Sequence, residues 1–372
     1  MGTQHLFSPL TIASPSGPGL TLRNRLIVAP MCQYSVDDLG GVPTDWHLQH
    51  LGSMAAGGFG MVVTEATGVE PRARISPRDL GLYTDEQQDA HARIVSFIHA
   101  QGAASAIQLG HAGAKASSYP GLPGLPEGTV PPQEGGWIPR GATTEPVRDG
   151  YDAPEALDED GIAAVVRAFA EAAARADAAG YDAVQIHAAH GYLLHQFLSP
   201  LTNTRTDEYG GSEENRTRLT REVVAAVRAV WPDEKPLGIR FSAVDWTPGG
   251  WGIESMIRLA RTLVSDYGVT WIDASTGGLD KSEFIEVGPG YQVRFAAALR
   301  EALDGTNATV SAVGLIDDAF QAETILASGQ ADAISIGRAA LRNPHWAAQA
   351  AARLGVASDE NPRSIPLWRA RW

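Results

Sequence analysis

The feature of this sequence that most limits its possible folds is the alternation of short apolar runs with longer amphipathic stretches. Eight runs have the length and composition of buried strands, and each is followed by a segment whose apolar residues recur at helical spacing. The predicted strands are 26–29, 61–64, 103–108, 183–186, 237–241, 269–274, 309–313 and 333–336. The predicted helices are 45–56, 85–100, 159–179, 212–231, 253–267, 292–303, 317–328 and 343–354. Eight strand–helix pairs predict an α/β protein with a closed (β/α)8 barrel, the TIM barrel.

Two segments stand outside this alternation. Residues 5–24 are rich in Ser, Gly and Pro and precede the first strand, so we expect them to plug one end of the barrel. Residues 115–155 contain many Pro and Gly residues and follow the third strand. A loop of this length is usually a functional lid or a disordered stretch, so we interpret it as a capping excursion. The prediction is a single domain over residues 1–372, with 356–372 as a C-terminal tail.

Composition narrows the classes of function. The 43 acidic residues exceed the 29 Lys and Arg residues, which gives a formal net charge of -14. Surfaces for nucleic acid or anionic membranes require clustered basic residues, so neither partner is expected. Cys32 is the single cysteine, and it leaves no internal disulfide or cysteine-built metal cluster within one chain. We see no secretion signal and no apolar run near 18 residues, so we expect a cytoplasmic protein.

Three polar side chains arrive where the fourth strand should end, in the pattern His187-x-x-His190-x-Tyr192. Two imidazoles can donate hydrogen bonds to one developing oxyanion, and a nearby phenol can deliver a proton. Two alternatives stay open on these residues alone. The histidines could be polar groups satisfied at a strand end, or they could share a metal ion, as two of three ligands in a hydrolase.

The carboxyl ends of the other strands should meet the same pocket, because barrel active sites are built on that face. Gln108 and Arg240 there suggest a planar, electron-rich heterocycle, since Gln both donates and accepts and Arg stabilises negative charge. The alternative for Arg240 is an ion pair inside the barrel. Gly residues after strands seven and eight, together with Arg338, suit a phosphate group.

At this point the sequence resembles a known family over nearly its whole length, the Old Yellow Enzyme family of FMN-dependent ene-reductases. Several of its motifs occur here in the family's order. They are Asn24-Arg25-Leu26-Ile27-Val28-Ala29-Pro30-Met31, Gln108-Leu109-Gly110-His111-Ala112-Gly113, the run from His187 to Pro200, and Asn203-x-Arg205-x-Asp207-x-Tyr209-Gly210-Gly211-Ser212-x-Glu214-Asn215-Arg216. The run Met31-Cys32-Gln33-Tyr34 resembles the thermophilic-like subgroup, which includes the xenobiotic reductases.

The resemblance implies tightly bound FMN and reduction by NADPH. It implies that His187 and His190 bind the carbonyl oxygen of an activated alkene, that hydride passes from flavin N5 to the β-carbon, and that Tyr192 protonates the α-carbon. Tyr34 would border the substrate. The implied cofactor-binding residues are Ala29, Pro30, Met31, Cys32, Ala66, Gln108, Arg240, Val313, Gly314, Gly337 and Arg338. The subgroup also implies a homodimer or homotetramer in which Trp368, Arg369, Arg371 or Trp372 enters a neighbouring active site.

Three rival interpretations compete with this one. A metal hydrolase built on His187 and His190 leaves Gln108 and Arg338 unexplained. The dienoyl-CoA or trimethylamine type of enzyme needs an iron–sulfur cluster, which one cysteine cannot hold. A barrel used only for binding would not need a tyrosine beside two histidines. For Cys32 itself, a role in tuning the flavin and a role as an inert buried thiol both remain open.

Overall fold

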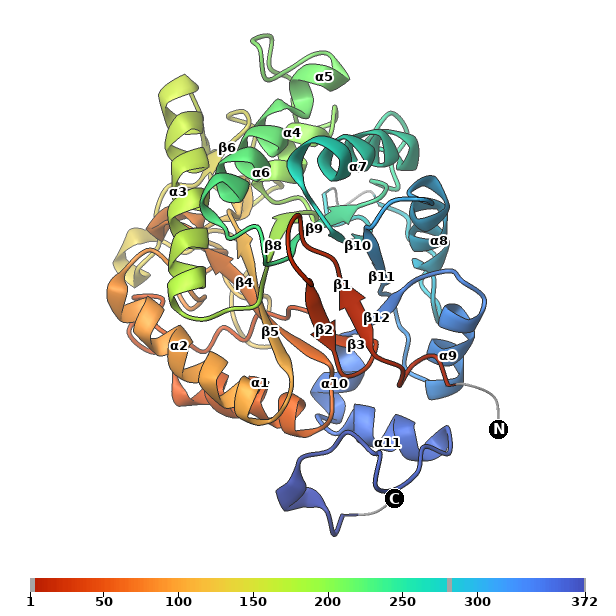
Figure 1. The fold of residues 1–372 in the computed structure, drawn as a ribbon. Helices are drawn as coiled ribbons and strands as arrows, with labels where there is room; N and C mark the ends of the chain where they lie inside the picture. Colours follow the sequence, from red (N-terminus) through yellow and green to blue (C-terminus); the bar gives the residue numbers. More distant parts are fainter. Residues whose placement is uncertain (1–3, 280–282, 371–372) are drawn as a thin grey trace.

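Eight parallel strands close into one barrel, which confirms the (β/α)8 fold (Figure 1). The structure is a computed structural model that describes residues 4–279 and 283–370. The barrel strands are β3 (Leu26–Val28), β4 (Met61–Gly68), β5 (Ala104–Gly110), β8 (Ala183–Ala188), β9 (Leu237–Ser242), β10 (Trp271–Ser275), β11 (Thr309–Ala312) and β12 (Ala333–Ile336). Each strand pairs in parallel with the next along the chain, and β12 pairs with β3 to close the ring. The carboxyl ends of all eight strands therefore face one mouth.

Helices surround the barrel and cover its outer face (Figure 1). They are α1 (Asp45–Ala56), α2 (Asp85–Ala100), α3 (Glu159–Ala178), α4 (Leu193–Leu198), α5 (Glu213–Arg216), α6 (Arg218–Val230), α7 (Ile253–Tyr267), α8 (Val293–Ala302), α9 (Ala319–Ala327), α10 (Arg338–Arg342) and α11 (Trp346–Arg353). Helix α3 shows why they form, because the Asp158 side chain caps its first turn by accepting the N–H of Gly161. Its residues Ile162, Val165 and Phe169 follow helical spacing and are buried.

A short hairpin fills the barrel end opposite the mouth, as predicted for the N-terminal segment. Strands β1 (Leu10–Ile12) and β2 (Leu20–Leu22) pair antiparallel across this end (Figure 1). Ile12 and Leu22 are buried there in one apolar cluster with the first residues of the barrel strands. That cluster includes Ile27, Met61, Val63, Ala106, Ala183, Trp271 and Ala333. We call β1 and β2 the plug.

The capping segment, residues 115–155, has little regular structure but is tied to the barrel. It contains the short parallel pair β6 (Arg140–Gly141) and β7 (Glu155–Ala156). The Arg205 guanidinium donates to the carbonyls of Ala142 at 2.9 Å and Leu157 at 2.6 Å. Trp137 donates through its indole to the carbonyl of Arg72 at 3.1 Å. These bonds hold the segment as an ordered cover.

Some element boundaries differ from the sequence prediction. Strand β4 continues beyond residue 64 to Gly68, and its register against β5 shifts between Thr64 and Ala66. The predicted helix 212–231 is divided at Thr217 into α5 and α6. The last predicted helix begins at Trp346, after the separate helix α10. For β4 the reason is that its second half contains the polar residues Glu65 and Thr67, which interrupt the apolar run.

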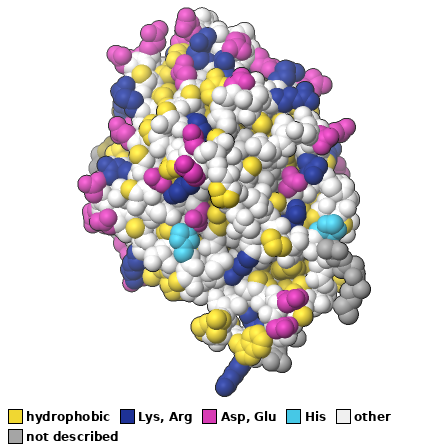
Figure 2. Space-filling view, in the orientation of Figure 1, with side chains coloured by type: hydrophobic (Ala, Val, Ile, Leu, Met, Phe, Trp, Pro, Cys, Tyr) yellow, Lys and Arg dark blue, Asp and Glu magenta, His cyan; other side chains and the backbone are white. Residues whose placement is uncertain are grey.

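On the face that carries the plug, acidic and basic side chains are interspersed (Figure 2). Across residues 4–279 and 283–370, the helices are all too short or too polar to span a lipid bilayer.

Candidate active site

The carboxyl end of β8 brings His187, His190 and Tyr192 together at the barrel mouth. The His187 ring lies edge-on to both others, with ring centroids 5.1 Å from His190 and 5.0 Å from Tyr192. Beyond β8 the chain turns through two residues of left-handed backbone, His190 at φ 59° and Gly191 at φ 70°. This turn is what allows two histidines only three residues apart to face the same point.

Two ring nitrogens converge at this point, Nε2 of His187 and Nδ1 of His190, which are 3.4 Å apart. The N–H of Ala189 donates to Nδ1 of His187 at 3.3 Å, so His187 carries its proton on Nε2. Nε2 of His190 lies 2.8 Å from the Ser275 hydroxyl, whose other acceptor is Oε1 of Gln292 at 3.4 Å. When this hydroxyl donates over the shorter distance, to Nε2, the ring proton of His190 lies on Nδ1. Both converging nitrogens can therefore donate to one acceptor.

Burial sets the protonation of all three side chains. Desolvation, followed by the positive charge of Arg240, lowers the pKa of His187 and of His190 well below the ordinary value. Desolvation also raises the pKa of Tyr192 well above the ordinary value for a phenol. At neutral pH the site therefore holds two neutral imidazoles and a protonated phenol, which suits hydrogen-bond donation and proton delivery.

Gln108 and Arg240 both lie inside the barrel mouth, and each already has a protein partner. The Gln108 amide donates to Oε1 of Gln185 at 2.8 Å, while Nε2 of Gln185 is buried without a hydrogen-bond partner among the described residues. Arg240 lies 3.1 Å from Oδ1 of Asp273, so the ion pair considered as an alternative does form. Arg240 nevertheless also lines a cavity, so the ion pair and a ligand-binding role are compatible.

That cavity has a volume of about 170 Å³ and joins the ends of β9, β11 and β12. Its lining includes the predicted phosphate residues Val313, Gly314, Gly337 and Arg338 together with Arg240. Gly314 has a φ of 126°, and a Cβ there would lie 2.9 Å from Nε2 of Gln292. A glycine cradle, two arginines and the unpartnered amide of Gln185 are the donor set that a phosphorylated polar ring system needs, so the residues fit FMN.

The remaining predicted cofactor residues lie on two neighbouring strands. Ala29 and Pro30 follow β3 directly, and the N–H of Ala29 donates to the carbonyl of Ile336 at 3.0 Å. Met31 follows, with its sulfur 3.6 Å from the position of a Cβ on Gly337. Ala66 lines a small cavity that His187 and Tyr192 also line.

Cys32 lies beside two buried carboxyl groups that the sequence analysis did not identify, Glu65 and Asp79. Desolvation raises the pKa of Asp79 to about 7 and raises that of Glu65 well above the ordinary value. Desolvation and these carboxyl groups raise the pKa of the Cys32 thiol. Cys32 is therefore a protonated thiol at neutral pH, which disfavours nucleophilic reactivity.

Lys115 is a third site residue that the sequence analysis did not identify. Its ammonium donates to the carbonyls of His190 at 2.9 Å and of Gly278, and it lies 5.7 Å from the Tyr192 ring centroid. Desolvation lowers its pKa to about 8. The available signal was its place at the end of η2 (Gly113–Lys115), five residues after β5.

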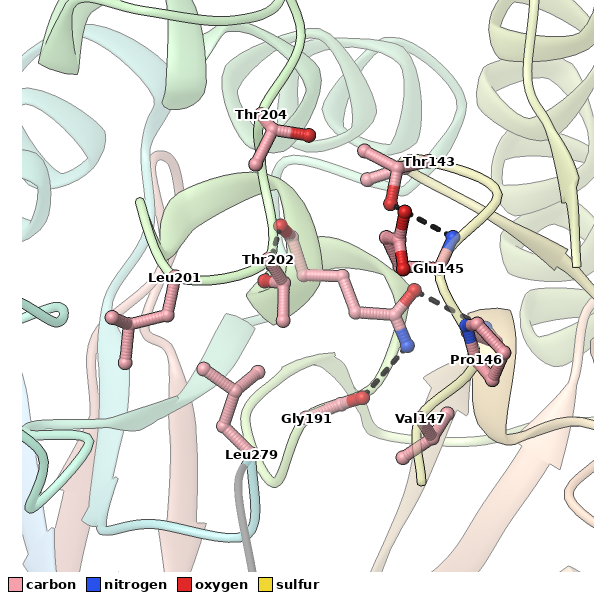
Figure 3. Close-up of a pocket in the computed structure, with 12 residues that line it drawn as sticks. Thr143, Glu145, Pro146, Val147, Gly191, Leu201, Thr202, Thr204 and Leu279 are labelled. Atoms are coloured by element: carbon pink, nitrogen blue, oxygen red, sulfur yellow. Dashed lines mark hydrogen bonds between the residues drawn. The ribbon is translucent and has the colours of Figure 1, made fainter. Parts of the chain in front are cut away.

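Two cavities lie beneath the capping segment. One, of about 360 Å³, is lined by Tyr34, Lys115 and Tyr192 on the barrel side. The other, of about 240 Å³, lies beside Gly191 and is lined by Thr143, Thr202 and Thr204 (Figure 3). Val147 and Leu279 line both cavities and form the wall between them.

The C-terminal tail lies at the plug end of its own barrel, away from the mouth. Ser364 donates through its N–H to the carbonyl of Ala56 and through its hydroxyl to Gln101 at 2.7 Å. Trp368 is partly exposed, and the Arg363 guanidinium lies 5.2 Å from its ring centroid. Arg369 follows, while Arg371 and Trp372 lie outside the described residues. No described tail residue lines the mouth cavities of its own chain.

The side chains at the mouth also bear on the interpretation in which His187 and His190 bind a metal ion. Within 4–279 and 283–370, no three His, Cys, Asp or Glu side chains are grouped so that they could hold a metal ion. His187 and His190 thus lack the third protein ligand that the hydrolase interpretation needs.

Comparison with known proteins places the chain among flavin enzymes. Residues 5–356 match the model of the NADH:flavin oxidoreductase / NADH oxidase family. An NADPH dehydrogenase from Listeria innocua is 43% identical over 350 residues, which cover 94% of this chain and 96% of that protein. An NADPH dehydrogenase from Halalkalibacterium halodurans is 42% identical over 341 residues, covering 91% and 93% of the two chains.

Solved structures share the fold. Morphinone reductase superposes with a TM-score of 0.74 at 29% identity, covering 96% of this chain and 91% of that one. A 2-naphthoyl-CoA reductase complex reaches a TM-score of 0.82 at 24% identity, which is a likeness of fold alone. The match covers 96% of this chain and 53% of that protein, so this chain spans about half its length.

Proposed function

This chain belongs to the NADH:flavin oxidoreductase / NADH oxidase family, in its Old Yellow Enzyme type, and from that premise we propose that it is an ene-reductase. It is an oxidoreductase, with FMN as its cofactor and NADPH as its reductant. Its proposed reaction is reduction of the C=C bond of α,β-unsaturated carbonyl compounds. When bound, FMN supplies the hydride chemistry, accepting a hydride from NADPH and passing one to the β-carbon of the alkene.

The cofactor would be held by residues from most of the barrel strands. Arg338 and the glycine cradle at Gly314 and Gly337 would bind the phosphate, and Gln108 and Arg240 would bind the ring edge. Ala29, Pro30 and Met31 would contribute their backbone, with Cys32 and Ala66 beside the ring. The cavity, the buried amide of Gln185 and the positive charge of two arginines support this assignment.

The observation that carries the proposal is the convergence of His187 Nε2 and His190 Nδ1, 3.4 Å apart. One carbonyl oxygen placed to the side of this pair, within reach of both nitrogens, would accept two hydrogen bonds. Because both imidazoles are neutral, each bond strengthens as the oxygen gains negative charge, so the enolate is stabilised more than the ground state. The buried, protonated phenol of Tyr192 lies beside them and would protonate the α-carbon.

Anaerobic stopped-flow absorbance tests this function. The purified protein is reduced with NADPH and then mixed with 2-cyclohexenone. We expect a yellow protein that bleaches with NADPH and regains its colour with the enone. A flavin that bleaches but is not reoxidised by any activated alkene would refute the ene-reductase reaction while leaving the cofactor in place.

We also propose that the protein is cytoplasmic, belongs to the thermophilic-like subgroup and works as a homodimer or homotetramer. The position of the tail supports the last point, because Trp368 and Arg369 lie at the plug end and cannot reach the mouth of their own barrel. They, or Arg371 or Trp372, would then enter a neighbouring site.

A further inference from the structure

The turn between His190 and Tyr192 is held at its central residue, Gly191, through both of its backbone polar groups. The N–H of Gly191 donates to Nδ1 of His195 at 2.9 Å. The Gly191 carbonyl accepts from the Gln196 amide at 2.8 Å, the bond drawn to Gly191 in Figure 3. A Cβ at Gly191 would lie 2.3 Å from the Gly278 carbonyl, so this residue also fits tightly against the loop after β10. Two consecutive residues of α4 thus fix the turn that positions the catalytic groups.

His195 is held in turn by Asp245, which lies in the connection after β9. Nε2 of His195 is 2.8 Å from Oδ1 of Asp245, and both side chains are fully buried. Oδ2 of Asp245 accepts from the Ser199 hydroxyl at 2.6 Å and from the N–H of Trp251 at 2.7 Å. The carboxylate is therefore fixed by three donors.

These contacts allow His195 only one tautomer. Nδ1 faces an N–H donor, so it must be without a proton. Nε2 faces a carboxylate, so it must carry the proton. A carboxylate that selects a tautomer determines what the other ring nitrogen can do, and here that nitrogen must accept the N–H of Gly191.

We propose that Asp245 and His195 are positioning residues of the active site. Asp245 holds His195 in the Nε2–H tautomer, and the bare Nδ1 then holds Gly191 so that His190 and Tyr192 face the substrate. The role in catalysis rests on the proposed ene-reductase function, whereas the tautomer is a property of the protein alone. Neither residue touches the reacting atoms.

Asp245→Asn tests the relay, because the structure dictates how the new amide must lie. The N–H of Trp251 needs an acceptor, so the amide oxygen stays on that side and the amide NH2 faces Nε2 of His195. The proton then moves to Nδ1, where it opposes the N–H of Gly191. We expect reoxidation by 2-cyclohexenone to slow about 10- to 100-fold, the effect known for partners that orient metal-binding histidines. Asp304→Asn, the same change at an exposed position, is the matched control.

The decisive variant is the double substitution Asp245→Asn with His195→Asn. The side-chain oxygen of the asparagine introduced by His195→Asn occupies the place of Nδ1 and accepts the N–H of Gly191 whatever residue 245 is. We therefore expect the double variant to reoxidise at least about tenfold faster than Asp245→Asn alone, the lower end of the loss that it reverses. A purely structural role for Asp245, in holding Ser199 and Trp251, gives no such rescue and would overturn the proposal.

A pair of single variants gives the same answer if Asp245→Asn does not fold. His195→Asn keeps the acceptor for Gly191, whereas His195→Gln keeps a group that reaches Asp245 and loses that acceptor. We expect His195→Gln to be the slower of the two with the enone. The opposite order would show that the link to Asp245, not the link to Gly191, is what matters.

Nitrogen NMR of protein labelled at its 10 histidines reads the tautomer directly. The His195 signal, identified by its loss in His195→Asn, should report a bare Nδ1 in the wild type and a protonated Nδ1 in Asp245→Asn. A wild-type His195 with a protonated Nδ1 would overturn the relay. If no alkene reoxidises the wild type while the tautomers are as expected, the proposed function fails and the relay stands.

Discussion

The two ends of the barrel are built from the same eight strands but bury different kinds of side chain, apolar at the plug end and polar at the mouth. At the plug end, the strands contribute Ile27, Met61 and Trp271, which pack with Ile12 and Leu22 into an apolar cluster. At the mouth, the same strands contribute buried polar groups, among them Gln108, His187, Arg240, Asp273 and Ser275. Apolar packing supplies stability at one end, and at the other end desolvated polar groups set protonation states for chemistry.

The comparison predicts that the two ends can be damaged independently. A substitution at the mouth should change reaction rates with little loss of stability, and a substitution in the plug should do the reverse.

The largest effect is expected for Tyr192→Phe, which removes the phenolic proton and keeps the ring. We expect reoxidation by 2-cyclohexenone to slow about 10²- to 10⁴-fold, the usual contribution of a positioned general acid. Reduction of the enzyme by NADPH should persist, because that step needs no proton from Tyr192. Stopped-flow absorbance measures both half-reactions, and equal losses in the two would remove Tyr192 from the proton-donor role.

The next largest effect is expected for a substitution in the plug, and it should be an effect on stability. Ile12→Ala should lower the free energy of unfolding by about 2–5 kcal/mol, because Ile12 is fully buried and its loss leaves a cavity. Thermal and denaturant unfolding measure the change, and both half-reaction rates should stay at the wild-type level.

Thr11→Ala is the matched control, since Thr11 is exposed between two buried residues of β1 and should cost less than about 0.5 kcal/mol. If Ile12→Ala slowed the reaction as much as it lowered stability, the two ends would be coupled and the comparison would fail.

The third prediction concerns the pH dependence of stability, which should change on substitution of Asp79 and not on substitution of a plug residue. Because the pKa of Asp79 is raised to about 7 in the folded protein, the folded state keeps a proton that the unfolded state loses between about pH 4 and 7. The free energy of unfolding of the wild type should therefore fall as pH rises through this window. The full loss of stability is reached above the window. Asp79→Asn cannot ionise and should gain stability relative to the wild type over the same range.

Urea unfolding at several pH values measures this difference, which should be on the order of a few kcal/mol by about pH 8. The effect of Ile12→Ala should not vary over the same range, because no ionisable group is changed. A difference between Asp79→Asn and the wild type that is constant with pH would contradict the raised pKa.

The smallest effect is expected for Cys32→Ala. Replacing a protonated thiol beside the proposed flavin site should shift the midpoint potential of the flavin by on the order of 10 to 30 mV, which for two electrons corresponds to about 1.4 kcal/mol or less. Spectroelectrochemical titration measures the shift. An unchanged potential would leave Cys32 as a packing residue.

The same contrast explains what could be predicted from the sequence. The barrel strands can be predicted from the sequence because a strand that is buried on both faces is a continuous apolar run. The prediction for β4 stopped at residue 64 because Glu65 and Thr67 are polar, yet they continue the strand into the mouth. In a sequence pattern, polar residues indicate the end of a strand. In this barrel they indicate the mouth, where the proposed active site lies.

The candidate site was predictable where one strand end carries several groups, and not where contacts are distant in sequence. His187, His190 and Tyr192 are local to one strand end. Lys115 reaches His190 over 75 positions, and Asp245 reaches His195 over 50. Spacing along the chain contains no signal for such pairs, because the residues meet through the pairing of β5 with β8 and of β8 with β9.

The wall between the two cavities has a further consequence, for how such an enzyme diversifies. Val147 comes from the capping segment and Leu279 from the loop after β10, so neither belongs to the barrel strand that leads to the proposed catalytic residues. A smaller residue at either position would join the cavities without moving His187, His190 or Tyr192. Selection for new substrates would then act on loops that the chemistry does not constrain. Related enzymes could therefore differ in substrate range and keep the same reaction.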